Sequence, residues 1–188
     1  MVNNALSTPE NEIAARKAIE DNPTSALAYY NLGFLLSQDN SRASEAKIAF
    51  QKAIELEPNN PRYVYRLGLL LHENLHGFSE AEIAYRRAIE LAPDDLFYYG
   101  GLISLFVQQS RQAEALPLSI KMREGLSAVE NWYGLATLEA ILGNIDTAID
   151  YLRQAASKEN FDHRWAQNDP DLVSLRDDPR FKEIVGFL

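Results

Sequence analysis

The sequence predicts an all-α fold, an α-solenoid built of stacked helical hairpins. Two stretches of the chain return after a constant offset of 35 residues: residues 29–36 match 64–71, and residues 46–58 match 81–93. Self-similarity at a fixed period is typical of repeat arrays, in which a unit buries its apolar face only against its neighbours. Within each copy the apolar residues recur at three and four positions, so each unit is expected to be a pair of amphipathic helices.

Four hairpins with a cap at each end account for the chain, and we expect them to form one single domain. The helix-ending and turn residues recur with the same period. Pro58 and Pro93 end the second helices, and the polar pairs that follow suit a turn and a new helix start. We expect an N-terminal capping helix in residues 1–25, hairpins in 26–60, 61–95, 96–128 and 129–162, and C-terminal capping helices in 163–188.

Both predicted caps carry helix-start signals. Ser7 or Thr8 suits the N-cap of a helix over residues 9–21, which resembles the second helix of a missing unit. Near the other end, Asp169 and Asp178 are each followed by proline, the pattern of an Asp N-cap with proline at the first helical position. The two short helices that start there are expected to cover the exposed end of the core, as the termini of a solenoid require.

The third hairpin is the irregular one. Ile103 stands where the first two units have a mid-helix glycine, and the terminal proline is missing. Gly100 and Gly101 are predicted to lie in the middle of a helix, where each glycine costs about 1 kcal/mol relative to alanine. One interpretation is a depression where a ligand backbone approaches closely. The other is drift in a weakened repeat, which Pro117 inside the second helix also indicates.

Composition and charge exclude several classes of protein. At 188 residues, with 46% hydrophobic and 24% charged, the chain is long enough for one sizeable domain and too apolar for disorder. A net charge of -9 and a pI near 4.8 argue against nucleic acid as a partner. The absence of cysteine excludes disulfides and thiolate metal sites, and we expect no cofactor.

The sequence carries no targeting signal that we can identify. Residues 1–6 lack the basic and apolar regions of a signal peptide, so the cytoplasm is the expected compartment. No segment approaches the roughly 20 apolar residues that a membrane helix needs. Membrane association would therefore have to go through a partner.

The repeated residues resemble the tetratricopeptide repeat (TPR) family. The pattern of that family is an aromatic residue, Leu-Gly, Ala, an aromatic, Ala and Pro, and the first unit meets it with Tyr29, Leu32, Gly33, Ala46, Phe50, Ala53 and Pro58. The second unit matches from Val64 to Pro93 and the later units match in part, so the resemblance covers about three quarters of the chain. It implies a right-handed superhelix. The segment from Asp169 to Phe181 also resembles an ending seen after bacterial arrays, which indicates a bacterial source.

The small residues of the pattern have a structural explanation. Gly33, Gly68 and Ala136 are expected where two helices cross closely. A larger side chain at either glycine should overpack the crossing and cost roughly 1 to 3 kcal/mol. We therefore interpret these residues as structural.

The resemblance implies that the first helix of each hairpin lines a concave surface, which in the family grips a peptide or a partner helix. Side chains one step round from the core stripe are then the candidate partner-binding residues. Aromatic and Arg side chains among them are the types that dominate interface energy, although some rings could instead pack against neighbouring hairpins. The candidates are Tyr30, Asn31, Phe34, Arg62, Tyr65, Arg66, Leu69, Phe97, Gly100, Ser104, Tyr133 and Thr137.

Two arginines within this set could bind an anion. Arg62 and Arg66 are four residues apart on one predicted helix, so both guanidinium groups can converge on one carboxylate. With Asn31 they resemble half of the carboxylate clamp of chaperone-binding TPR domains. The other half has no counterpart, and Tyr30 and Phe34 stand where a clamp would want polar groups. The alternative is that the arginines are solvated or paired within the chain.

Residues 72–76 spell His-Glu-Asn-Leu-His, the H-E-x-x-H pattern of zinc proteases. Two histidines four apart on a helix bind catalytic zinc only with a third ligand and a cleft. The repeat register places residues 75–78 in a turn, so His76 is expected to leave the helix that carries His72. We expect no metal and no catalytic residue.

The sequence therefore predicts a non-enzymatic adaptor, scaffold or assembly factor that binds a peptide or helix of a partner protein in its concave groove. A self-assembling structural module, which stacks through its ends or its convex face, is the alternative. A zinc-dependent hydrolase using His72, Glu73 and His76 is a third and weaker candidate.

Overall fold

The computed structural model describes residues 9–186, and in that part of the chain every regular element is a helix. Contacts between Cα atoms divide the chain into two compact units, residues 1–105 and 106–188, and the boundary falls inside one helix. We describe each unit by itself. The predicted helix of residues 9–21 is present, while its predicted N-caps Ser7 and Thr8 lie outside the described residues.

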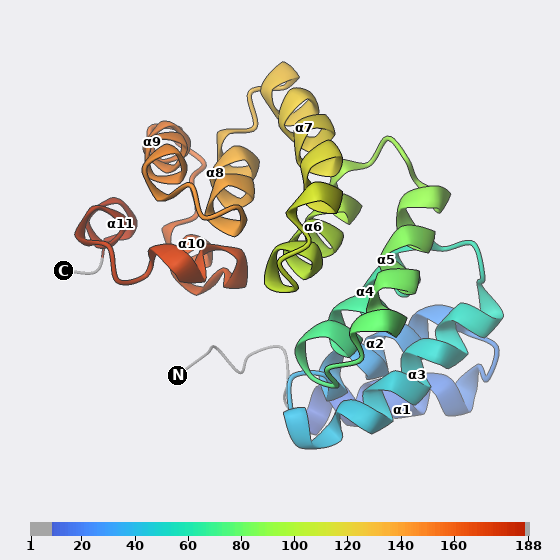
Figure 1. Cartoon of the computed structure of the whole chain (residues 1–188). Helices are drawn as coiled ribbons and strands as arrows, with labels where there is room; N and C mark the ends of the chain where they lie inside the picture. Colours follow the sequence, from blue (N-terminus) through green and yellow to red (C-terminus); the bar gives the residue numbers. More distant parts are fainter. Residues whose placement is uncertain (1–8, 187–188) are drawn as a thin grey trace. The chain divides into compact units, whose positions relative to one another are not determined.

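Unit 1 contains one leading helix and two complete helical hairpins. Its helices are α1 (Pro9–Asp21), α2 (Ala26–Leu36), α3 (Ala43–Leu56), α4 (Pro61–Glu73) and α5 (Phe78–Leu91), with short 3-10 turns at Asn40–Arg42 and Leu96–Tyr98 and the start of α6 (Tyr99–Gln108). The ribbons of α3 and α5 run in front of α2 and α4 in Figure 1. The two hairpins are α2 with α3 and α4 with α5, because the helices of each pair pack against each other.

Unit 2 contains the remaining helices of the described chain. These are α7 (Gln112–Ala128), α8 (Trp132–Ile141), α9 (Ile145–Ala156), α10 (His163–Asn168), a 3-10 helix at Pro170–Leu175 and α11 (Pro179–Val185). Pro117 lies inside α7 as predicted. The turn between α8 and α9 contains Gly143 at a φ of +80°, a conformation that glycine adopts without strain.

Polar side chains start the helices where the sequence predicts them. Asn60 accepts a hydrogen bond from the backbone N–H of Arg62 at 3.2 Å, with Pro61 at the first helical position of α4. Asp169 and Asp178 cap the 3-10 helix and α11 in the same way, accepting from backbone N–H groups at 2.9 and 2.8 Å. Because these signals act within two or three residues, the sequence locates helix starts well.

The C-terminal elements cover the end of the core in unit 2. Leu172, Leu175, Phe181 and Val185 are buried together with Ala136 and Leu152 of the fourth hairpin. The 3-10 helix and α11, which begin after Asp169 and Asp178, therefore pack against the fourth hairpin. The sequence did not predict α10, which comes before them.

Aromatic rings fill the space that the mid-helix glycines leave. Phe50 on α3 and Tyr85 on α5 are 1% and 0% exposed. A Cβ atom added at Gly33 would lie 2.8 Å from Cδ1 of Phe50, and one added at Gly68 would lie 2.9 Å from Cδ1 of Tyr85. Carbon atoms normally pack about 3.5 to 4.0 Å apart. The close crossings predicted at these glycines are confirmed.

Gly100 and Gly101 lie in the first turn of α6, so the prediction of a mid-helix position was wrong. A 3-10 turn at Leu96–Tyr98 comes first and delays the α-helix, because Asp95 caps that turn through the backbone N–H of Phe97. The cost of two glycines is smaller at a helix start than in a helix interior.

The geometry separates the two histidines of the H-E-x-x-H pattern. Helix α4 ends at Glu73, and His76 follows in the turn with a φ of +50°. His72 is buried, and its Nδ1 lies 3.3 Å from the Tyr85 hydroxyl. Among the described residues no group of three His, Asp or Glu side chains is placed to hold a metal ion.

Candidate protein-interaction site

The candidate site of unit 1 is a surface on the first helices of its hairpins, which we call the first-helix face. Asn31, Arg62 and Phe97 are exposed on it, and Phe34, Arg66 and Leu69 are half-buried. The exposed fraction of Phe97 is 57%, large for an aromatic side chain. The face thus combines apolar and cationic groups that solvent can reach.

Arg62 is held by the hairpin that precedes it. Its Nε donates a hydrogen bond to the hydroxyl of Tyr30 at 3.1 Å, and its guanidinium carbon lies 5.1 Å from the centre of the Tyr30 ring. The Tyr30 ring stacks on Tyr63 with centroids 4.9 Å apart. A cation over an aromatic ring contributes about 0.5 to 1 kcal/mol at an exposed site. Arg62 therefore occupies a defined position on the face.

Arg66 repeats this arrangement one helical turn further on. Its guanidinium carbon lies 5.2 Å from the centre of the Phe34 ring. In the part of the chain that the structure describes, neither Arg62 nor Arg66 forms an ion pair with a carboxylate. The planar guanidinium group binds carboxylates through N–H groups at its edge, whereas it meets a ring through its face. Both arginines keep edge N–H groups for an anionic ligand.

Tyr30 and Tyr65 are not exposed on this face, contrary to the sequence prediction. Their exposed fractions are 4% and 6%. The Tyr65 ring contacts three others, Tyr85, Phe97 and Tyr98, with centroids 5.0 to 5.4 Å apart. These rings belong to the packing between hairpins, which was the alternative interpretation of the aromatic positions. Tyr30 and Tyr65 therefore offer almost no exposed surface to a partner.

Gly100 and Ser104, the predicted site residues on α6, are half-buried. A Cβ atom added at Gly100 would have no heavy atom within 4 Å, so open space lies beside this backbone. Gly101 differs, because an added Cβ would lie 2.6 Å from Cε1 of Tyr85. The structure thus assigns Gly101 to packing and leaves Gly100 next to open space.

The predicted site residues of unit 2 are engaged in internal hydrogen bonds. The Tyr133 hydroxyl donates to Oδ2 of Asp169 at 2.5 Å, and burial together with this hydrogen bond raises the pKa of Tyr133. Thr137 is buried and donates to the carbonyl of Gly134 at 2.9 Å. Thr137 is therefore not placed to contact a partner, which corrects the prediction for that residue.

Two cavities border the predicted residues, each within one unit. In unit 1 a cavity of about 360 Å³ between α1 and α2 is lined by Asn31 and Phe34 together with Asn11, Ala14, Ala15, Ala18, Ala28 and Leu35. In unit 2 a cavity of about 340 Å³ has an aromatic wall made of Trp132, Tyr133, Phe161 and Trp165. Both offer apolar surface next to polar groups, as ligand sites do.

The aromatic wall in unit 2 was not predicted, because the sequence did not predict α10. Trp165 is 59% exposed, and its position depends on Asp162, which accepts a hydrogen bond from the Trp165 backbone N–H at 2.9 Å. Aspartate is a favoured N-cap residue, so Asp162 could have indicated the start of this short helix.

Family models agree with the repeats seen in the sequence and the structure. Three models described as tetratricopeptide repeat match residues 14–47, 34–95 and 129–157. The part between residues 95 and 129, which contains the irregular third hairpin, is not matched by these models. Among curated proteins, none matches the sequence.

Several solved structures resemble the chain at low sequence identity. A structure from the functional characterisation of Pseudomonas aeruginosa PilF has a TM-score of 0.59 at 20% identity and covers 94% of this chain and 80% of its own. YrrB, described as a TPR protein with an unusual peptide-binding site, has a TM-score of 0.55 at 20% identity, covering 91% and 88%. MamA has a TM-score of 0.56 at 18% identity, covering 74% and 81%. At this identity the likeness concerns the fold.

The fold and the matches define an α-solenoid of helical hairpins, a class of protein that generally serves as a non-enzymatic interaction module. The chain belongs to the tetratricopeptide repeat family. No helix among the described residues is both long and apolar enough to cross a membrane.

Proposed function

We propose that this chain is a non-enzymatic adaptor, scaffold or assembly factor that binds an acidic peptide or helix of a partner protein on the first-helix face of unit 1. The observation that carries the proposal is the pair Arg62 and Arg66, each held against an aromatic ring of the preceding hairpin without a carboxylate partner among the described residues.

The geometry explains why such a site would favour binding. Ordering a free arginine costs side-chain entropy, and contact with Tyr30 or Phe34 has already restricted these two. Leu69 and Phe97 add apolar surface for an anchor residue next to the cations. A segment with one or two carboxylates beside an apolar side chain fits this combination. The family likeness supports the same kind of ligand, and YrrB is described as having a peptide-binding site.

A peptide array tests the proposal directly. The probes are short peptides of varied net charge, each made with a free carboxylate and with an amidated C-terminus. Acidic peptides should bind, and the double variant Arg62→Gln/Arg66→Gln should weaken them about 10-fold or more, as expected when charge-assisted hydrogen bonds are lost. Loss on amidation would identify a terminal carboxylate as the recognised group, and retention would identify acidic side chains.

A matched control removes two positive charges elsewhere. The double variant Arg153→Gln/Arg164→Gln changes exposed arginines of unit 2 and should leave peptide binding unchanged. Equal loss in both double variants would show that only net charge matters. Unchanged binding in Arg62→Gln/Arg66→Gln would refute the assignment to the first-helix face.

A further inference from the structure

The second helices of unit 1 expose an isoleucine at the same repeat position three times. Ile13 on α1, Ile48 on α3 and Ile83 on α5 are 66%, 68% and 68% exposed, and they are 35 residues apart. Single exposed apolar residues are normal on a protein surface and need no explanation. Here the same repeat position carries a large apolar side chain on three alternate helices, and all three side chains lie outside the hydrophobic core.

These three helices lie side by side and run in the same direction. In the contacts between α1 and α3, and between α3 and α5, a residue later in one helix meets a residue later in the other, as happens between parallel neighbours. Some of these contacts use a residue just outside one end of α3. They are Arg42 with Glu12 at 2.7 Å, Arg16 with Glu45 at 3.8 Å, Lys47 with Glu80 at 2.7 Å, and Arg87 with the carbonyl of Pro58 at 2.7 Å. The isoleucines therefore form a row across the helices, which we call the isoleucine row.

Charged rows flank the isoleucine row in a fixed order. Acidic residues precede it by three positions on each helix, and basic residues follow it by four, so each row lies about one helical turn from the isoleucines. The acidic row is Glu10, Glu45 and Glu80, and the basic row is Lys17, Lys52 and Arg87. Apart from Lys52, which is half-buried, these six side chains belong to exposed residues.

This order is complementary to itself. A two-fold axis that lies in the contact plane along the isoleucine row, and passes near Ile48, sets the two copies face to face and reverses the order of the charged rows in the second copy. The acidic row of each copy then faces the basic row of the other, and the isoleucine row faces itself. Such a self-complementary patch is what an isologous dimer interface requires, and opposite charges across it fix the register.

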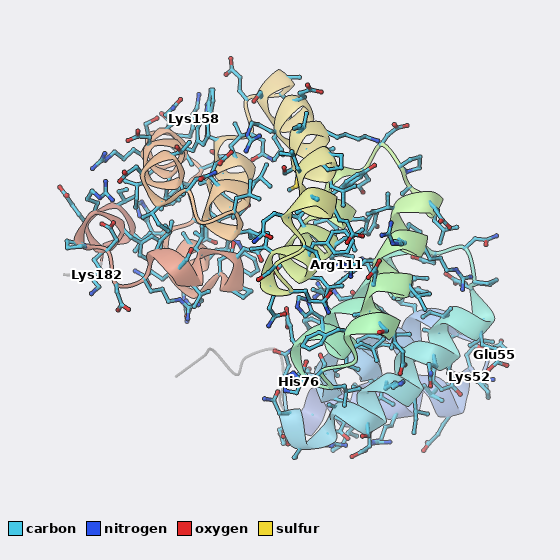
Figure 2. The ribbon with its side chains drawn as sticks, viewed as in Figure 1. Lys52, Glu55, His76, Arg111, Lys158 and Lys182 are labelled. Atoms are coloured by element: carbon cyan, nitrogen blue, oxygen red, sulfur yellow. The ribbon has the colours of Figure 1, made fainter. Side chains whose placement is uncertain are left out.

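Some of these charges already have partners within the chain, since Glu45 pairs with Arg42 at 3.0 Å and Glu80 with Lys47 at 2.7 Å. Lys52 and Glu55 pair at 2.9 Å at the outer edge of α3, where Figure 2 shows both side chains. Exposed pairs of this kind contribute less than about 1 kcal/mol, so the same cation can exchange partners at little cost. Burial of the isoleucines supplies the apolar part of the association.

We propose that this face of unit 1 binds a second copy of the chain, with the isoleucine rows packed against each other and the charged rows paired across the two-fold axis. The interface uses a different face from the one that carries Arg62 and Arg66. Self-association and peptide binding can therefore succeed or fail independently.

Sedimentation of the full chain over a range from about 1 µM to about 1 mM tests the proposal. The wild-type chain should form dimers in this range, and Ile48→Glu should weaken association at least about 10-fold, because it buries charge at the centre of the contact. Val129→Glu is the control, since Val129 is an apolar residue of unit 2 that is 72% exposed. It should associate like the wild type.

A charge exchange distinguishes this geometry from any other contact. Glu45→Lys alone places cations against Lys52 of the second copy, and Lys52→Glu alone places carboxylates against Glu45, so each variant should be monomeric where the wild type is dimeric. An equal mixture of the two should restore a heterodimer, because every pair is then complementary. Far-UV circular dichroism checks that all variants are folded. A wild-type chain that stays monomeric, or a mixture that stays monomeric, overturns the proposal.

Discussion

Gly100 and Gly101 are neighbours in the first turn of α6, but the structure predicts opposite effects when each is replaced by alanine. A Cβ atom at Gly101 would lie 2.6 Å from Cε1 and 2.8 Å from Cζ of Tyr85, and 3.1 Å from Cε2 of Tyr65. A Cβ atom at Gly100 would have no neighbour within 4 Å. The two substitutions are chemically identical and differ only in what the methyl group meets.

The magnitude follows from the contact distances. Carbon atoms pack at about 3.5 to 4.0 Å, so Tyr85 or the helix must move by about 1 Å to accept Gly101→Ala. Tyr85 is fully buried and its ring cannot swing into solvent. Overpacking of this kind costs about 1 to 3 kcal/mol, and the better helix propensity of alanine offsets at most about 1 kcal/mol. We expect Gly101→Ala to destabilise by about 1 to 2 kcal/mol and Gly100→Ala to stabilise by up to about 1 kcal/mol.

Urea and thermal unfolding, followed by circular dichroism, measure the difference. For a chain of this length 1 kcal/mol shifts the Tm by about 2 to 4 °C, so a difference of about 1 to 3 kcal/mol should separate the two variants by about 2 to 12 °C. Adding Tyr85→Leu should relieve the clash, and the double-mutant cycle should then give a coupling energy above about 0.5 kcal/mol. If Gly101→Ala were as stable as Gly100→Ala, the packing of Tyr85 against α6 would be refuted.

Three further predictions concern charged and polar contacts within each unit. Hydrogen bonds from two arginines lower the pKa of Glu12 from its usual 4.5 to about 2. The contribution of this ion pair to stability is therefore complete above about pH 4.5 and is lost as the pH falls through about 2. Glu12→Gln should lower the free energy of unfolding by less than about 1 kcal/mol near neutral pH. Urea titrations at acid pH should show a smaller loss. Tyr133→Phe removes the donor to the buried carboxylate of Asp169 and should cost about 1 to 3 kcal/mol in urea unfolding, whereas an unchanged midpoint would contradict the hydrogen bond. Arg123→Met leaves Glu139, which is 3% exposed, without its ion pair at 2.7 Å. We expect the free energy of unfolding to fall by about 3 kcal/mol, and the double variant Arg123→Met/Glu139→Gln to recover part of this loss in the same assay.

The positions of the helices could be predicted from the sequence because their signals are local. A proline such as Pro58 ends a helix within two residues, and an Asn or Asp N-cap starts one within three. The repeat adds a second check, since each signal recurs 35 residues later. Helix α10 lacks both advantages, because it has six residues and no counterpart in the repeat.

Exposure of the aromatic residues could not be predicted from the helix period. Tyr30 and Tyr65 lie one step round from the core stripe of their helices, where the period alone predicts solvent. Their rings are covered by residues of the next hairpin, such as Tyr63 and Phe97, more than 30 positions further along the chain. The arginines are different, because a long charged side chain keeps its end in water even when its stem is packed.

Many of the hydrogen bonds that join successive hairpins or caps span about one repeat along the chain. Their separations run from 29 residues between Arg87 and Pro58 to 36 residues between Tyr133 and Asp169, while Arg123 and Glu139 are only 16 residues apart. Loops of about one repeat close at a nearly uniform entropic cost. Helical proteins whose contacts span so little of the chain fold within microseconds to milliseconds. A nascent chain can therefore complete its first hairpins before the ribosome has supplied the last, since synthesis adds only about 5 to 20 residues per second.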